Sequence, residues 1–165
     1  MIATALGQLL GCAPGPAPVP TPTPAFSSEE EAFAAAEEVY RAYNDALNQS
    51  RIATDTPPNP RIYLTGPALE SDLEATRYLQ AQGLEVIGEG TVAGFDGTAA
   101  ALNSGEVEVT ANVCLDVSHT QVVDANGGDV TPQGRPTRLP LNVAFVGSDG
   151  ALLISSSNLI ESDAC

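Results

Sequence analysis

Few residues in this chain could do chemistry, and the most suggestive group is Asp116, Ser118 and His119. His119 is the only histidine, and an imidazole with an unperturbed pKa of about 6.5 can act as an acid or a base. Successive side chains of a strand point to opposite faces, so residues 116 and 118 share one face and residue 119 lies on the other. This alternation argues against a Ser-His-Asp triad, and we assign no catalytic residue from the sequence.

The acidic stretch at residues 124–129 has a superficial likeness to a calcium-binding loop. Such a loop needs a ligand at its fifth position and an acid at its twelfth, where this chain has Gly128 and Arg135. We therefore interpret the stretch as a turn. The three cysteines form no Cys-x-x-Cys pair, and with one histidine they predict no metal site. We also expect no cofactor, because phosphate-binding glycine loops and dinucleotide motifs are missing.

The composition bounds the class of protein. The chain has 165 residues, of which 43% are hydrophobic, and a formal net charge of -15. This length and apolar content predict one folded domain with a short extra segment. All six basic residues are dispersed arginines, so a nucleic acid would meet no basic footprint and is not an expected partner.

A short apolar stretch at residues 2–10 precedes Gly11 and Cys12. It has the length of the hydrophobic region of a signal peptide and is too short to cross a bilayer. Its end, Leu-Leu-Gly-Cys, resembles the lipobox of bacterial lipoprotein precursors, in which the cysteine is acylated and becomes the mature N-terminus. The resemblance implies that residues 1–12 are a signal peptide, N-terminally incomplete because no Lys or Arg precedes the apolar run. The alternative is a chance cysteine in a frayed N-terminus.

Prolines occupy every second position from 14 to 24. Each proline fixes its own φ and pushes the preceding residue towards extended geometry. We therefore expect residues 13–27 to form a semi-rigid linker, with a reach on the order of 40 Å between Cys12 and Phe26. This pattern favours a stalk that holds a domain away from a membrane, and an idle linker is the alternative.

Two helices are expected at the start of a globular domain at residues 28–165. The Ser-Ser-Glu-Glu-Glu run at 27–31 offers a capping box in either of two registers. Apolar residues at 3-4-3-4 spacing then predict a helix of about five turns with one buried face: Phe33, Ala36, Tyr40, Tyr43 and Leu47. A second helix opens at Gly66-Pro67 and ends at Gly83, its C-cap. Its predicted buried side carries Leu69, Leu73, Thr76 and Leu79.

The hydrophobic period changes from 3.6 to 2 after the second helix. A strand is expected to begin at Leu84 and to be bent by Gly88 and Gly90. The clearest alternation runs over residues 107–117, where every odd position is apolar, and it predicts a long strand with one buried face. Further strands are expected at residues 139–145 and 152–159. Helices followed by an antiparallel meander predict an α+β fold, with the helices packed on a bent sheet of about four strands.

This order of elements resembles the NTF2-like cone fold. The lipobox, the proline stalk and the sequences VCLDVS, DVTP and SDAC also resemble small secreted lipoproteins of high-GC Gram-positive bacteria. The resemblance implies an NTF2-like domain anchored by fatty acyl chains on the extracellular face of the cytoplasmic membrane. It implies no particular activity, because NTF2-like domains serve as enzymes, binding modules and inert spacers alike.

The same resemblance sets the expectation for the cysteines. Acylation of Cys12 would leave Cys114 and Cys165, which the oxidising conditions outside the membrane allow to form a disulfide. Cys114 lies on the non-core face of its predicted strand, so the bridge would fasten the C-terminal tail across that face. Two unpaired thiols are the alternative.

The function that the sequence favours is that of a non-enzymatic envelope lipoprotein that binds or spaces a partner protein or a cell-wall component. The alternative is a small-ligand carrier or an enzyme that uses the interior of the cone, with Tyr40, Tyr43 and His119 as lining residues. A deep cavity in which His119 and an acid converge would favour an enzyme. A filled core with an exposed apolar patch would favour a protein partner.

Overall fold

The computed structural model of the chain describes residues 25–53, 55–103, 105–148, 150–161 and 165. The predicted lipobox at Cys12 and residues 13–24 of the predicted linker lie outside these residues, so both remain predictions. The linker was predicted to run to residue 27, but Phe26 is buried in the core, so the folded unit begins earlier than predicted. Within the described residues, no helix has the length and apolar character needed to cross a membrane.

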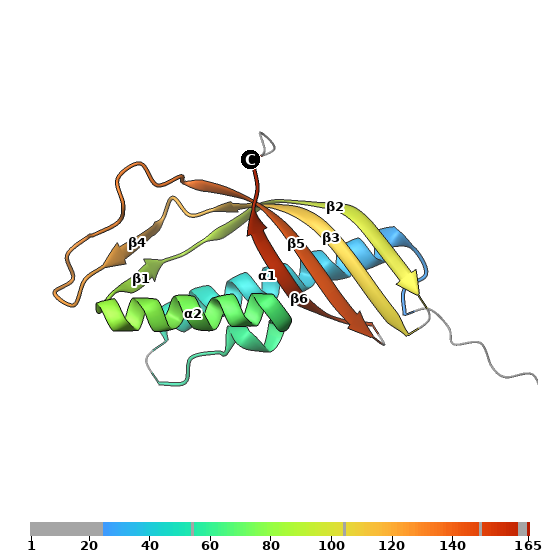
Figure 1. Cartoon of the computed structure of the whole chain (residues 1–165), viewed down its shortest axis with the longest axis horizontal. Helices are drawn as coiled ribbons and strands as arrows, with labels where there is room; N and C mark the ends of the chain where they lie inside the picture. Colours follow the sequence, from blue (N-terminus) through green and yellow to red (C-terminus); the bar gives the residue numbers. More distant parts are fainter. Residues whose placement is uncertain (1–24, 54, 104, 149, 162–164) are drawn as a thin grey trace, which may run out of the picture.

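The described part of the chain is an α+β fold, with the helices first and the strands after them, as predicted (Figure 1). Strands β2, β3, β5 and β6 form one bent antiparallel sheet in that order, which is open rather than closed into a barrel. Strands β1 and β4 pair separately as a two-stranded antiparallel sheet. In chain order the elements are α1 (Glu29–Ile52), the 3-10 helix η1 (Pro60–Tyr63), α2 (Gly66–Gln82), β1 (Glu85–Gly88), β2 (Thr91–Asn103), β3 (Glu106–Asp116), β4 (Thr120–Val123), β5 (Arg138–Ser148) and β6 (Ala151–Leu159).

Helix α1 begins with the predicted cap. The Ser28 hydroxyl accepts a hydrogen bond from the Glu31 backbone N–H, with a donor–acceptor distance of 3.2 Å. The Glu31 carboxylate in turn accepts one from the backbone N–H of Ser27, at 2.8 Å. These reciprocal bonds satisfy donors that a helix start leaves free, and they explain why the helix begins at this point.

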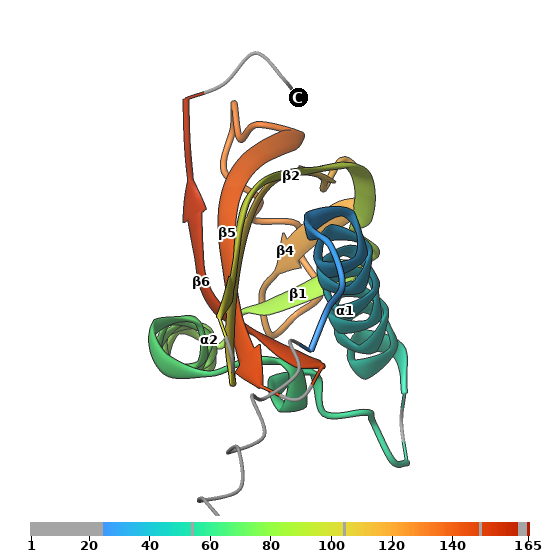
Figure 2. The ribbon, with the colours of Figure 1, turned by 90° about the vertical axis from the view of Figure 1, so that its right-hand side faces the viewer.

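One face of α1 packs on the sheet (Figure 2). The most buried line of the helix consists of residues four apart. The predicted stripe is confirmed at Ala36 and Tyr40, whereas Phe33, Tyr43 and Leu47 flank the buried line and are half-buried. The buried line itself runs through Ala32, Ala36, Tyr40 and Asn44. Its small alanines allow the helix to approach the sheet closely.

Helix α2 ends at Gly83, which has the left-handed φ of 64° expected of a C-cap. None of its residues is fully buried, and the four residues of its predicted buried side are half-buried. The reason is its position, because α2 lies beside β6 instead of covering the middle of the sheet (Figure 1). Just before the helix, Leu64 forms a parallel bridge with Ile154, and the Thr65 N–H donates to the Ile154 carbonyl oxygen at 2.9 Å.

The alternation predicted for β3 is confirmed. Its odd positions from 107 to 113 are almost completely buried against α1, together with residues of β5 and β6 such as Phe145 and Ile154. We call the face of the four-stranded sheet that these residues occupy the inner face. The opposite face, which carries the even positions of β3, is called the outer face.

The strand expected to start at Leu84 is in fact two strands of different sheets. Gly88 ends β1 with a φ of 80°, and a Cβ at this position would collide with the carbonyl oxygen of His119. The chain then turns through Gly90, whose carbonyl accepts hydrogen bonds from the side-chain amides of Asn44 and Asn48 on α1, at 2.9 and 2.8 Å. The glycine pair therefore separates the sheets instead of bending one strand.

The predicted disulfide between Cys114 and Cys165 is present, with a Cα–Cα distance of 5.2 Å. Cys114 lies on the outer face of β3, in register with Gly94 and Pro140. The bridge therefore holds Cys165 against the outer face, as expected. Arg138 supports the same contact, because one of its guanidinium nitrogens donates to the Cys165 carbonyl oxygen at 3.2 Å.

Candidate ligand-binding cavity

A cavity of about 310 Å³ lies between α1, α2 and the inner face of the sheet. Its lining combines aliphatic, small and phenolic side chains from six segments: Tyr40, Tyr43, Asn44, Leu47, Leu64, Ala68, Ser71, Asp72, Ala75, Leu115, Leu141, Ile154 and Ser157. Both tyrosines that the sequence predicts as lining residues belong to this set. The volume falls at the small end of the range of ligand pockets, which is roughly 300–1,000 Å³.

The cavity exists because α2 presents small residues to it. Ala68, Ser71, Asp72 and Ala75 recur at helical spacing and therefore share one face of α2. These short side chains do not reach across to the larger side chains of α1. The space between the two helices is consequently left open above the sheet.

Two tyrosines of α1 form the phenolic wall of the cavity. The rings of Tyr40 and Tyr43 are tilted by 59° with centroids 6.0 Å apart, a favourable aromatic arrangement. Burial raises the pKa of Tyr40 well above its ordinary value, and the neighbouring Tyr43 adds to this, while a hydrogen bond with Ser157 acts in the opposite direction. Tyr40 therefore stays a neutral phenol at physiological pH and can donate or accept a hydrogen bond.

Charged groups gather around Tyr43. Burial raises the pKa of Tyr43, the Asp72 carboxylate adds to this, and the guanidinium groups of Arg51 and Arg61 oppose it. Asp72 is paired with Arg61, with an Nε–Oδ2 distance of 2.6 Å, and Arg61 also donates to the Thr76 hydroxyl at 2.8 Å. Arg61 thus fastens η1 to α2 at the edge of the cavity.

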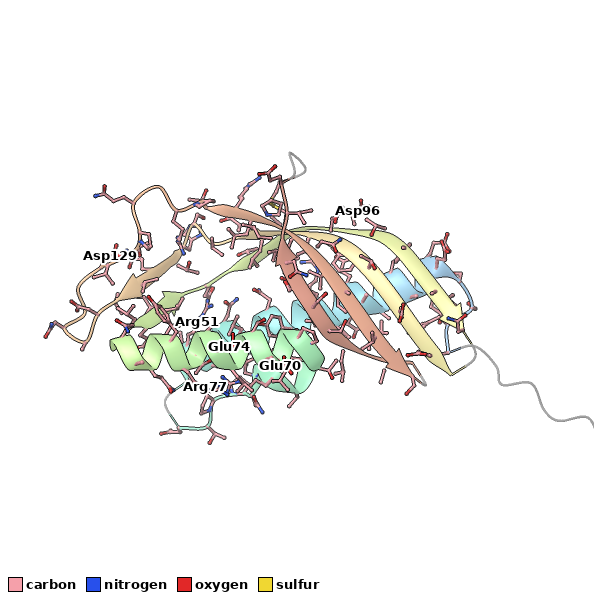
Figure 3. All side chains as sticks on the ribbon, viewed as in Figure 1. Arg51, Glu70, Glu74, Arg77, Asp96 and Asp129 are labelled. Carbon is pink, nitrogen blue, oxygen red and sulfur yellow. A yellow bond between two sulfur atoms is a disulfide. The ribbon has the colours of Figure 1, made fainter. Side chains whose placement is uncertain are left out.

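Arg51 of α1 lies near the end of β1 and is labelled in Figure 3. Its guanidinium donates to the Gly88 carbonyl oxygen at 3.2 Å and to the Asn48 side-chain oxygen at 3.4 Å. Burial lowers the pKa of Arg51. Arg51 and Arg61 both act electrostatically on Tyr43, and the charge of Arg61 is balanced by its ion pair with Asp72.

His119 does not line this cavity, contrary to the expectation from sequence. It is exposed in the turn between β3 and β4, because β3 ends at Asp116 and the chain turns outward there. Its Nδ1 lies 3.2 Å from the Ser118 hydroxyl oxygen. Asp116 accepts from the Ser118 backbone N–H at 2.9 Å and pairs with Arg138, so these side chains do not assemble the order of contacts that a triad needs.

The acidic stretch at 124–129 is the predicted turn. One carboxylate oxygen of Asp124 accepts from the backbone N–H groups of Asn126 and Gly128, at 2.8 and 2.9 Å. These backbone hydrogen bonds lower the pKa of Asp124. Across the described ranges, no cluster of three ligating side chains has the arrangement to hold a metal ion.

Sequence reasoning missed the contribution of α2 and β6 to the cavity. It assigned α2 a buried leucine side, whereas Ser71 and Asp72 turn out to face the cavity. The sequence pattern that could have revealed this face is the recurrence of small residues at 68, 71 and 75. Side chains this short cannot fill the gap between α2 and the neighbouring elements. Ser157 carries no comparable signal, because its role depends on the distant pairing of β6 with β5.

No protein-family profile and no curated protein matches this sequence. Among solved structures, the chain is similar to the crystal structure of the intermembrane space region of the chloroplast protein ARC6. The TM-score is 0.49 and the sequence identity 13%, with 79% of this chain and 97% of that chain covered. A likeness at this level carries no argument about function.

Proposed function

We propose that this protein is a lipid-anchored lipoprotein of a Gram-positive cell envelope, whose NTF2-like domain binds a small, mainly apolar molecule without transforming it. The observation that carries the binding role is the cavity between α1, α2 and the sheet. Its volume of about 310 Å³ corresponds to roughly ten water molecules. Aliphatic walls with a few polar groups are typical of sites that bind small molecules.

The polar groups of the cavity support binding over catalysis. Tyr40 is a neutral phenol at physiological pH, burial raises its pKa further, and it is suited to orienting a ligand by a hydrogen bond. The Asp72 carboxylate is already engaged by Arg61. Neither Tyr40 nor Asp72 is therefore available as a general base. His119, the only histidine of the chain, does not line the cavity.

Two further observations support the envelope location. The Cys114–Cys165 disulfide is typical of proteins in oxidising compartments. The lipobox and the proline-rich stretch that follows it match the order of a signal, an anchor and a stalk. Two fatty chains on Cys12 would anchor the protein stably, since each buried CH₂ contributes about 0.8 kcal/mol and a single chain is marginal.

The binding role is tested with N-phenyl-1-naphthylamine, a neutral dye that fluoresces when it leaves water. We expect the disulfide-bonded domain to bind the dye saturably. Ala68→Phe fills the cavity and should weaken binding at least tenfold, whereas Ala81→Phe adds the same ring at an exposed position of α2 and should leave it unchanged. Equal binding by Ala68→Phe and the parent would overturn the cavity as the site. Thermal midpoints of both variants establish that they are folded.

The anchor is tested by expressing the protein in a Gram-positive host that is fed an alkynyl fatty acid. The parent protein should carry the label and partition into the detergent phase, and Cys12→Ser should lose both properties. An unlabelled parent protein in the cytosol would refute the envelope assignment. It would leave the dye-binding result untouched, so the two parts of the proposal fail separately.

A further inference from the structure

A row of polar side chains crosses the outer face of the four-stranded sheet. Asp96 of β2, Asn112 of β3, Asn142 of β5 and Asn158 of β6 are paired in register, one from each strand. Residues in register share a face and neighbouring strands lie about 4.8 Å apart, so the row is roughly 14 Å long. Helix α1 packs on the other face, and Asp96 points away from it (Figure 3).

The two central amides of this row, those of Asn112 and Asn142, hold each other in position. The Asn142 side-chain nitrogen donates to the Asn112 side-chain oxygen at 3.1 Å. A primary amide has two donor hydrogens and an oxygen with two lone pairs, so each asparagine of the pair retains capacity for further hydrogen bonds. Both are half-buried in the row, while Asp96 and Asn158 at its ends are exposed. The centre of the row therefore offers donors and acceptors in fixed places, and the exposed ends add further polar groups.

A hollow of about 210 Å³ adjoins one end of the row. Asp96 and Asn112 supply its polar side. Its apolar side consists of Pro140, Ile160 and the Cys114–Cys165 bridge, and the Ile160 backbone N–H is bonded to the Pro140 carbonyl oxygen at 3.0 Å. The disulfide thus builds one wall of the hollow. The volume corresponds to roughly seven water molecules, which is enough for one sugar ring.

These surfaces complement an amino-sugar chain. A pyranose ring has an apolar C–H face and a rim of hydroxyl groups, and an acetamido substituent adds one N–H donor and one carbonyl acceptor. The carboxylate of Asp96 accepts hydrogen bonds from hydroxyls, and the asparagine amides match the acetamido group. The net charge of -15 disfavours an anionic polymer but does not affect a neutral one. We propose that the hollow and the row bind a neutral, N-acetylated sugar chain, at a site separate from the cavity between the helices.

The proposal is tested with chitotetraose, a chain of four N-acetylglucosamine units, titrated into the ¹⁵N-labelled, disulfide-bonded full chain. We expect saturable shifts of backbone amides around Asp96, Asn112 and Cys114. Asp96→Ala should weaken binding about tenfold or more, because it removes charge-assisted hydrogen bonds. Glu108→Ala removes the same charge from an exposed position further along the outer face and should leave the affinity within twofold of the parent.

A second variant, at the far end of the row, tests the proposal independently in case Asp96→Ala does not fold. Asn158→Ala alters an exposed side chain and should also weaken binding of the tetramer, while thermal midpoints establish that each variant is folded. The proposal is overturned if millimolar chitotetraose causes no saturable shift, or if Asp96→Ala and Glu108→Ala behave alike. Binding of maltotetraose with the same affinity overturns it too, because that sugar lacks acetamido groups.

Discussion

A single missing side chain sets how closely α1 approaches the sheet. Gly97 of β2 lies directly under the ring of Phe33, and a Cβ at this position would overlap the ring atoms nearest the backbone. Those atoms cannot swing aside as the tip of a long side chain can. Glycine within a strand weakens it, so close approach of another group is the usual reason for finding one there. The Phe33–Gly97 contact is therefore a point of exact fit between helix and sheet.

Gly97→Ala should destabilise the domain by about 1–3 kcal/mol, because the added methyl group overpacks this contact. Urea unfolding at equilibrium measures the change, and Gly97→Ala should cost much less stability in a Phe33→Ala background than in the parent, because the ring that it would overlap is then gone. Gly94→Ala is the matched control, since its Cβ would meet only the Cys114 Cβ at an ordinary contact distance of 3.6 Å. If both variants lose the same stability, the contact with Phe33 is not the cause.

Helices and long strands follow from local rules, and the shorter elements do not. The caps of α1 and α2 and the alternation of β3 could be predicted because each depends on residues close in sequence. Strand β4 was missed and the strand at Leu84 was assigned too simply, since Gly88 pairs with Thr120, more than thirty residues away. The tyrosines of the cavity were predicted from the α1 stripe. The open space beside them depends on where α2 lies, which no local pattern specifies.

Arg61 fastens α2 to η1, because its guanidinium donates hydrogen bonds to both Asp72 and Thr76 of that helix. Arg61→Ala should raise the amide hydrogen-exchange rates of residues 66–82, since α2 has no fully buried residue and its stability depends more strongly on polar contacts of this kind. It should also weaken binding of N-phenyl-1-naphthylamine. Arg77→Ala is the control, as it removes an exposed arginine from the same helix and should alter neither readout. Unchanged amide hydrogen-exchange rates in Arg61→Ala would show that Arg61 does not hold α2 in place.

The start of α1 makes stability sensitive to acid. Hydrogen bonds from the side chain and backbone of Ser27 lower the pKa of Glu31 below its ordinary 4.5 in the folded protein. A carboxyl with a lowered folded pKa stabilises the fold above its unfolded value, and this contribution is lost as the pH falls through the folded value. Thermal midpoints measured between pH 6 and 3 should therefore decline less steeply for Glu31→Gln than for the parent. Identical slopes would show that the cap does not titrate with folding.

At the scale of the whole molecule, the disulfide joins Cys114 of β3 to Cys165, the last residue, which is 51 positions away. Closing a loop of this length stabilises a protein by about 4 kcal/mol in the chain-entropy account. The same bridge fastens the tail to the outer face, so it affects both overall stability and the shape of the hollow beside Pro140. Its effect should consequently appear only when the thiols are oxidised.

Cys165→Ser should lower the thermal midpoint relative to the parent under oxidising conditions, and the difference should vanish when both proteins are measured in excess reductant. Scanning calorimetry with and without reductant makes the comparison. A deficit that persists in reductant would assign the effect to packing of the side chain instead of the bridge.

The short pairing of Leu64 and Thr65 with Ile154 has a consequence for molecules that crowd together. An open sheet margin presents free backbone donors and acceptors, and these readily recruit strands from neighbouring molecules into aggregates. The segment that leads into α2 occupies part of the β6 margin with the chain's own backbone. The turn that positions α2 therefore also protects part of the β6 edge, and this should help the protein to stay soluble at high local concentration.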